Sequence, residues 1–111
     1  MKNDFVYLKH ILESTKNIDE YIEGFNYDVF IKDKKTIAAV VRELEVIGEA
    51  AGKLSDEFKA QNLEIPFRDI IDMRNFLIHE YFGVDTKVVW DTCKDDLPKL
   101  KGVIEEFLAR E

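Results

Sequence analysis

The residues with the clearest chemical potential are an arginine and a histidine five positions apart, Arg74 and His79. An arginine binds phosphate through a fixed fan of N–H donors, and a histidine exchanges protons near neutral pH. Arg68 and Asn75 lie in the same segment, at helical spacings that bring Arg68, Asn75 and His79 to one side of a helix. These residue types could together bind a phosphate and act on it.

Each of these residues also has a structural interpretation. On a helical wheel Arg74 lies in an apolar stripe, where it could pair with Glu45 or Glu49 of the preceding helix. His79 could be a surface histidine near a helix end, and Tyr81 could be a core ring with its hydroxyl at the edge. The spacing alone does not choose between these interpretations and a phosphate site.

The angle between Arg74 and His79 is a geometric difficulty, because five residues of an ideal helix place the two positions about 140° apart. Three arrangements would bring the side chains together. The helix could loosen before His79, the long arginine could reach round, or a second subunit could complete the site. The third arrangement would also bury the apolar stripe around Arg74 in a dimer contact.

Composition and charge restrict the class of protein. The chain has 111 residues, of which 46% are hydrophobic and 35% charged, and these values predict a single domain over residues 1–111. The sequence contains no apolar run of the roughly 18 residues that a membrane span needs. A single cysteine, Cys93, and an N-terminus unlike a signal peptide predict a cytoplasmic protein.

The formal net charge of −7 argues against a wide basic face for nucleic acid. Any action on nucleic acid must therefore depend on a local positive site. The excess of acidic residues would also suit docking to a basic partner protein.

Hydrophobic spacing predicts an all-α fold, an antiparallel up-down four-helix bundle. Ser55 is the expected cap of a short helical turn, Asp85 or Thr86 the start of the last helix, and Pro98 the cause of a kink near residues 94–97. The four long helices are expected at about residues 4–23, 33–54, 66–82, and from 85 or 86 onward.

Several kinds of chemistry have no support in the sequence. It lacks a Cys–His cluster and an H-E-x-x-H pair, so no metal site is expected. It also lacks a glycine-rich phosphate loop and a nucleophile elbow. No cofactor is therefore expected, and Arg74-x4-His79-x-Tyr81 is the motif that remains.

Three segments resemble the HepT-like branch of the HEPN superfamily. The first is the run from Ile65 to Asp85, which contains the arginine and the histidine. The others are residues 42–51 and the continuation through residues 88–92 and 96–98. The similarity covers nearly the whole chain, and its combined pattern is far more specific than the spacing of two residues.

The resemblance implies a homodimeric helical bundle that cuts RNA without a metal, at a site in the dimer cleft. Arg74 and His79 would be catalytic, and Asn75 occupies the polar position that follows the family arginine. Arg68 would add positive charge beside them. The implied partner is a minimal nucleotidyltransferase antitoxin, which would silence the toxin by adding AMP to Tyr81 and could form a larger complex with it.

Two other functions stay open at this point. The chain could be a non-catalytic helical partner that positions nucleotide or substrate for a separate nucleotidyltransferase. It could also be a purely structural dimerising bundle. Toxicity of the chain expressed alone would distinguish the ribonuclease from both.

Overall fold

The structure, a computed structural model, describes residues 3–79 and 85–110, and for residues 74–79 it describes the backbone alone. All regular elements of the described residues are helices. In chain order they are α1 (Asp4–Tyr21), α2 (Tyr27–Phe30), α3 (Lys34–Gly52), α4 (Asp56–Gln61), α5 (Phe67–His79), α6 (Thr86–Asp91), a π-helical segment (Thr92–Asp96) and α7 (Leu97–Arg110).

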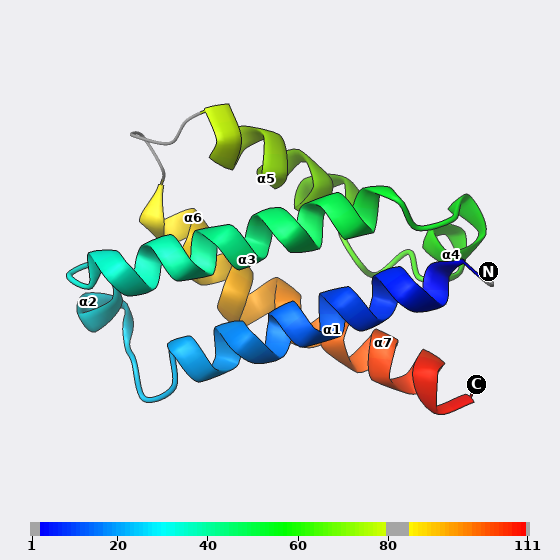
Figure 1. Ribbon diagram of the computed structural model, residues 1–111, viewed down its shortest axis with the longest axis horizontal. Coiled ribbons are helices and arrows are strands. Elements are labelled where there is room, and N and C mark those ends of the chain that lie inside the picture. The colour runs from blue at the N-terminus through cyan, green and yellow to red at the C-terminus, as the bar shows by residue number, and fades with distance from the viewer. Residues whose placement is uncertain (1–2, 80–84, 111) are drawn as a thin grey trace.

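The four longest helices alternate in direction, as predicted for an up-down bundle (Figure 1). The long helix α3 lies in the middle, with α1 along one side and α5 along the other. The last helix, α7, packs on α1. The predicted all-α fold is therefore confirmed, and the short helices α2 and α4 lie at opposite ends of α3 (Figure 1).

The core lies between these helices and consists of aliphatic side chains with aromatic rings at each end. Phe30 and Trp90 pack 5.1 Å apart at the end near α2, and Phe58 and Phe107 pack 5.3 Å apart near α4. Burying one such side chain contributes about 1.5–3 kcal/mol. Over the described residues, none of the helices has the length and apolar character needed to cross a membrane.

Side-chain caps fix where several helices begin. Ser55 accepts a hydrogen bond from the backbone N–H of Phe58 at 3.1 Å, and Asp85 accepts from Lys87 at 3.0 Å. Both predicted starts are confirmed. The predicted connector 25–32 contains the short helix α2, which the hydrophobic periodicity did not indicate. It is a single turn, and the side chain of Asn26 caps it by accepting a hydrogen bond from the N–H of Val29.

The predicted kink before Pro98 takes the form of a π-helical segment. Pro98 has no N–H to donate to the carbonyl of Lys94, and its ring would collide with that carbonyl in a regular α-helix. The chain widens into the π-helical turn at Thr92–Asp96, where the N–H of Leu97 reaches the carbonyl of Thr92. The helix therefore continues through the proline instead of breaking.

A buried aspartate joins the start of α1 to the start of α4. Asp4 is 2% exposed, and its two carboxylate oxygens accept hydrogen bonds from Ser55, from the backbone N–H at 2.7 Å and from the hydroxyl at 2.6 Å. Ser55 in turn caps α4. One carboxylate thus holds α4 against the bundle.

Replacing Asp4 by alanine is expected to lower the free energy of unfolding by about 2–3 kcal/mol, because it removes two charge-assisted hydrogen bonds and leaves Ser55 unsatisfied. Urea denaturation measures this change. Asp28→Ala is the control, since Asp28 is exposed in the first turn of α2. Equal effects of the two substitutions would contradict this role of Asp4.

Candidate functional site

The helix that carries the candidate residues, α5, begins at a well-fixed point. Ile65 is 3% exposed, and Pro66 follows it with a ring that suits the first turn of a helix. The N–H of Ile70 bonds to the carbonyl of Pro66 at 3.0 Å. The ring of Phe67 meets Phe58 of α4 edge-on, with centroids 6.1 Å apart. These contacts set the position of α5 relative to α4.

Helix α5 packs mainly on α3 and exposes its other side. Phe67 and Ile70 are buried, whereas Ile71 and Met73 are half-buried. The exposed side carries only charged residues up to Met73, and they are Arg68, Asp69 and Asp72.

The backbone of α5 is α-helical through His79, the last residue of the helix. The suggested loosening before His79 is therefore not observed. In a continuous helix Arg74 and His79 point about 140° apart and are separated by about 7.5 Å along the axis. Of the three suggested arrangements, two remain: an arginine that reaches round α5, and a site completed by a second chain.

The side chains of Arg74, Asn75 and His79 lie outside the described residues, and so does the whole of Tyr81. The helical backbone nevertheless places Arg68, Asn75 and His79 along one side of α5, at offsets of seven and four residues.

The two acidic candidates for pairing with Arg74 lie on α3, and each has a partner on that helix or at its C-cap. Glu45 Oε2 lies 3.7 Å from Arg42 Nη1, and Glu49 Oε1 lies 3.8 Å from Lys53 Nζ. The side chain of Arg74 lies outside the described residues, so the suggested pair with Glu45 or Glu49 stays a prediction.

An acidic hollow lies between α5 and the start of the last helical run. Its volume is about 550 Å³, and Ile70, Met73 and Val88 are among its apolar lining. Four carboxylates surround it, from Asp69, Asp72, Asp85 and Asp96.

Electrostatics makes this hollow unfavourable for RNA. Partial burial raises the pKa of Asp96 above its ordinary value, and the negative charges of Asp95 and Asp69 raise it further, against the opposing effect of Lys99. An anionic phosphate would meet the same repulsion.

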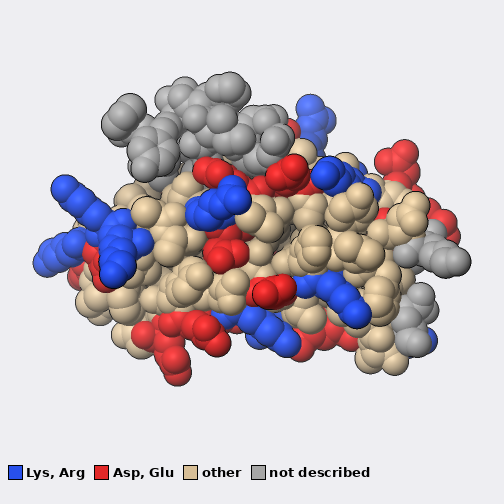
Figure 2. Space-filling view, viewed as in Figure 1, with Lys and Arg blue, Asp and Glu red and all other residues tan. Residues whose placement is uncertain are grey.

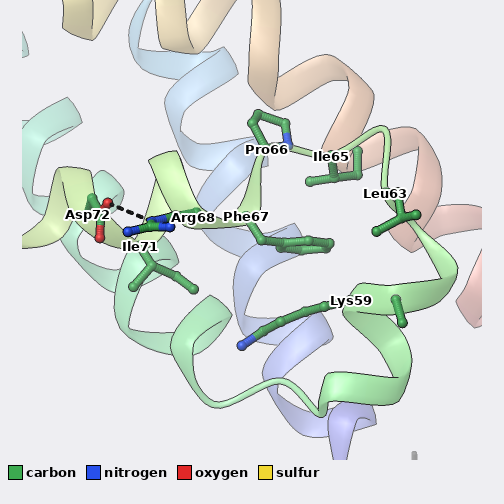
Figure 3. A pocket seen from close by; sticks show the side chains of 9 residues that line it. Lys59, Leu63, Ile65, Pro66, Phe67, Arg68, Ile71 and Asp72 are labelled. Atoms are coloured by element: carbon green, nitrogen blue, oxygen red, sulfur yellow. Dashed lines mark ion pairs between the residues drawn. The ribbon is translucent and has the colours of Figure 1, made fainter.

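A second hollow lies on the other flank of α5, beside its first turn (Figure 3). Its volume is about 480 Å³, and Lys59 of α4 and Arg68 of α5 provide its positive charge. Arg68 is almost fully exposed, and its Nε lies 3.8 Å from Asp72 Oδ2. Such a surface pair is worth at most about 1 kcal/mol, so the guanidinium can leave Asp72 for a phosphate.

Sequence reasoning did not find Lys59 or this hollow. Lys59 looked like part of a polar connector, and tertiary contacts such as that between Phe58 and Phe67 place it in the same hollow as Arg68. One local signal was present. It was Leu63, a large apolar residue in an otherwise polar connector. In the structure Leu63 is 83% exposed and lies at the edge of the hollow.

Other chemistry is poorly supported in the described part of the chain. Burial raises the pKa of the Cys93 thiol to about 12, so it stays protonated and inert at neutral pH. Among the side chains of residues 3–73 and 85–110, no cluster of His, Cys, Asp and Glu is suited to holding a metal ion. Figure 2 shows acidic and basic side chains interspersed over most of the visible face, without a wide basic surface.

Comparison with known proteins identifies the family. The family model described as HepT-like, "Ribonuclease HepT-like", matches residues 11–107. A protein of Thermococcus cleftensis named "Probable ribonuclease HepT" is 46% identical over 91% of this chain and 92% of its own length. A Caldanaerobacter subterraneus protein with RNase in its name is 39% identical over 100% of this chain and 99% of its own length. No solved structure matches the chain. The chain therefore belongs to the HepT-like ribonuclease family.

Proposed function

We propose that this protein is an endoribonuclease toxin that cuts RNA without a metal ion, with Arg74 and His79 as its catalytic residues. The observation that carries the proposal is the family match, which spans residues 11–107 and includes the whole Arg74-x4-His79 motif. The helical backbone of α5 supports it, because all six residues of the motif, 74–79, lie in a regular helix that ends at His79.

RNA carries its own nucleophile, so the site needs a base and a positive charge. In the proposed reaction His79 takes the proton of the 2′-hydroxyl, and that oxygen forms a bond to the adjacent phosphorus. The bond from phosphorus to the 5′-oxygen breaks, and the leaving oxygen takes up a proton. The products are a 2′,3′-cyclic phosphate and a 5′-hydroxyl. Arg74 stabilises the charge that builds on the phosphate, and Asn75 and Arg68 help to hold it.

The proposed active unit is a homodimer with its site in the cleft between two copies. A regular helix separates Arg74 and His79 by about 140°, and a second copy would bring the arginine of one chain to the histidine of the other. The acidic hollow on one flank of α5 repels phosphate, which would confine RNA to the cleft and the positive flank.

The proposed partner is a minimal nucleotidyltransferase antitoxin that adds AMP to Tyr81. Tyr81 follows His79 by two positions, so an attached nucleotide would lie next to the histidine. We infer that the added AMP would inhibit cleavage by filling the cleft and by placing negative charge where the substrate phosphate binds.

A second candidate function is a non-catalytic partner that positions a nucleotide for a separate nucleotidyltransferase. The net charge of −7 and the acidic hollow favour it, since both oppose binding to a long RNA. Growth of cells that express the chain alone distinguishes the candidates, because only the ribonuclease is expected to arrest growth.

The purified chain is expected to cut single-stranded RNA at an undiminished rate in excess EDTA. A single 2′-deoxynucleotide on the 5′ side of the mapped cut is expected to abolish cleavage there, because it removes the nucleophile. The matched control carries the deoxynucleotide one position further away and should be cut normally. Gel analysis of end-labelled RNA measures both results. Loss of cleavage in EDTA, or cleavage despite the deoxynucleotide, would contradict the proposed mechanism.

A further inference from the structure

The hollow beside the first turn of α5 combines an apolar floor with positive charge at its edge (Figure 3). Pro66, Phe67 and Ile71 contribute carbon atoms to the lining, together with the aliphatic part of Lys59 (Figure 3). The net charge of the chain is −7, yet two basic side chains, Lys59 and Arg68, line this hollow.

We propose that this hollow holds one unstacked base of the RNA strand close to the cut, while Lys59 and Arg68 bind the adjoining phosphates. The proposal rests on the proposed ribonuclease function and specifies its substrate as a single strand. It also adds Lys59 and Leu63 as positioning residues that the motif does not contain.

The position of the hollow along α5 supports this role. Arg68 precedes Arg74 by six residues, or about 9 Å of helix. Asp72, the last residue of α5 that lines the hollow, precedes Arg74 by about 3 Å. Because Arg68, Asn75 and His79 share a side of α5, a strand that leaves the proposed cut toward the start of the helix would reach the hollow.

The chemistry of the hollow fits the flat face of a base. Its volume of about 480 Å³ lies within the usual range for small-ligand sites, about 300–1,000 Å³. Its floor is largely carbon, which contacts a base without reading the polar groups on the base edge. A base in a regular duplex is stacked on its neighbours and could not enter. The subsite should therefore require an unpaired base and tolerate its identity.

The combination of positive charge and an apolar floor favours RNA over a neutral or basic protein segment as the occupant. Among the described residues of the lining Asp72 is the single carboxylate, and its weak pair with Arg68 leaves the guanidinium free to rotate. Lys59 has no ion pair within the described residues. Two cations beside an apolar floor match a nucleotide, which presents phosphate on one side and an aromatic face on the other.

The test uses two substitutions that spare the core. Lys59→Glu reverses one positive charge, and Leu63→Asp places a carboxylate on a side chain that is 83% exposed. The control is Lys16→Glu, which makes the same charge change at an exposed position of α1 outside the hollow. Each variant is assayed for kcat and KM on a single-stranded RNA with one mapped cut, and its thermal midpoint confirms that it is folded.

Lys59→Glu and Leu63→Asp are each expected to raise KM about tenfold, which is within the roughly 5- to 150-fold that one stacked base contributes to binding, and to change kcat less than twofold. Lys16→Glu should leave both constants unchanged. An abasic nucleotide at the position that enters the hollow should raise the KM of the wild type but add little to the effect of Leu63→Asp. If the two changes do not add, both remove the same contact between the base and the hollow. General charge repulsion would instead leave the effect of the abasic nucleotide unchanged in the variant.

Three outcomes would overturn the proposal. If the wild type cuts RNA and both variants keep its KM, the subsite is wrong while the ribonuclease function stands. If the variants keep KM but change the mass of the particle in light scattering, the hollow is a protein contact. If the wild type cuts no RNA, the proposed function fails and the subsite fails with it.

Discussion

His79→Ala is expected to lower kcat for RNA cleavage by about 10²- to 10⁴-fold, the usual contribution of a positioned general base. KM should change little, because in the proposed reaction the imidazole acts on the 2′-hydroxyl and adds little to RNA binding. His10→Ala is the matched control, since His10 is the other histidine of the chain and is exposed on α1. Single-turnover cleavage of end-labelled RNA measures both variants, and their thermal midpoints should stay close to that of the wild type.

Arg74→Lys adds information on the role of the arginine. Lysine keeps the positive charge but loses the planar pair of donors that binds two phosphate oxygens at once. A loss of about 10²- to 10³-fold in kcat would correspond to the removal of a fixed hydrogen-bond donor from the developing charge. A cleavage rate for His79→Ala equal to that of the wild type would show that the assignment of the site is wrong.

Mixing the two inactive variants tests whether the site is shared between chains. If Arg74 of one copy works with His79 of the other, a dimer of Arg74→Ala with His79→Ala contains one intact site and one doubly altered site. With random exchange of chains, the mixture should recover about one quarter of wild-type activity. A site formed within one chain would recover none, because each chain of the mixture lacks one of the two residues. The 140° separation on α5 predicts recovery.

Much of the fold was predictable because its determinants are local. Ser55 and Asp85 cap helices through bonds to residues three or fewer positions away. Pro98 disturbs the helix through its own ring and the carbonyl four residues earlier. Such features act within one turn of helix, so the sequence alone indicates them.

The parts that were missed depend on contacts between distant segments. Asp4 and Ser55 are 51 positions apart, and their hydrogen bonds hold α4 in place. The contact between Phe58 and Phe67 then brings Lys59 beside Arg68. Hydrophobic periodicity predicts which side of a helix is buried, but it does not predict which other segment packs against that side. The motif was therefore visible in the sequence, while the hollow next to it was not.

Phe58→Ala is expected to lower the free energy of unfolding by about 3–5 kcal/mol, the usual cost of removing a large buried ring. Phe58 is fully buried and packs edge-on against two other rings, Phe67 at the start of α5 and Phe107 near the end of α7. The cavity would therefore loosen three helices at once. Since small proteins are stable by only about 5–15 kcal/mol, a large fraction of the total would be lost.

The effect should extend to RNA cleavage, because Phe58 helps to fix both the start of α5 and the α4 segment that carries Lys59. Phe58→Leu keeps most of the volume and should cost markedly less than alanine, about 1–2 kcal/mol. Leu63→Ala, on the exposed segment after α4, should stay within about 0.5 kcal/mol of the wild type. Urea denaturation at one fixed protein concentration measures all three, since dimerisation would make stability depend on concentration. If Phe58→Ala costs no more than Leu63→Ala, the ring cluster does not hold α4 on α5, and the position of Lys59 beside Arg68 must have another cause.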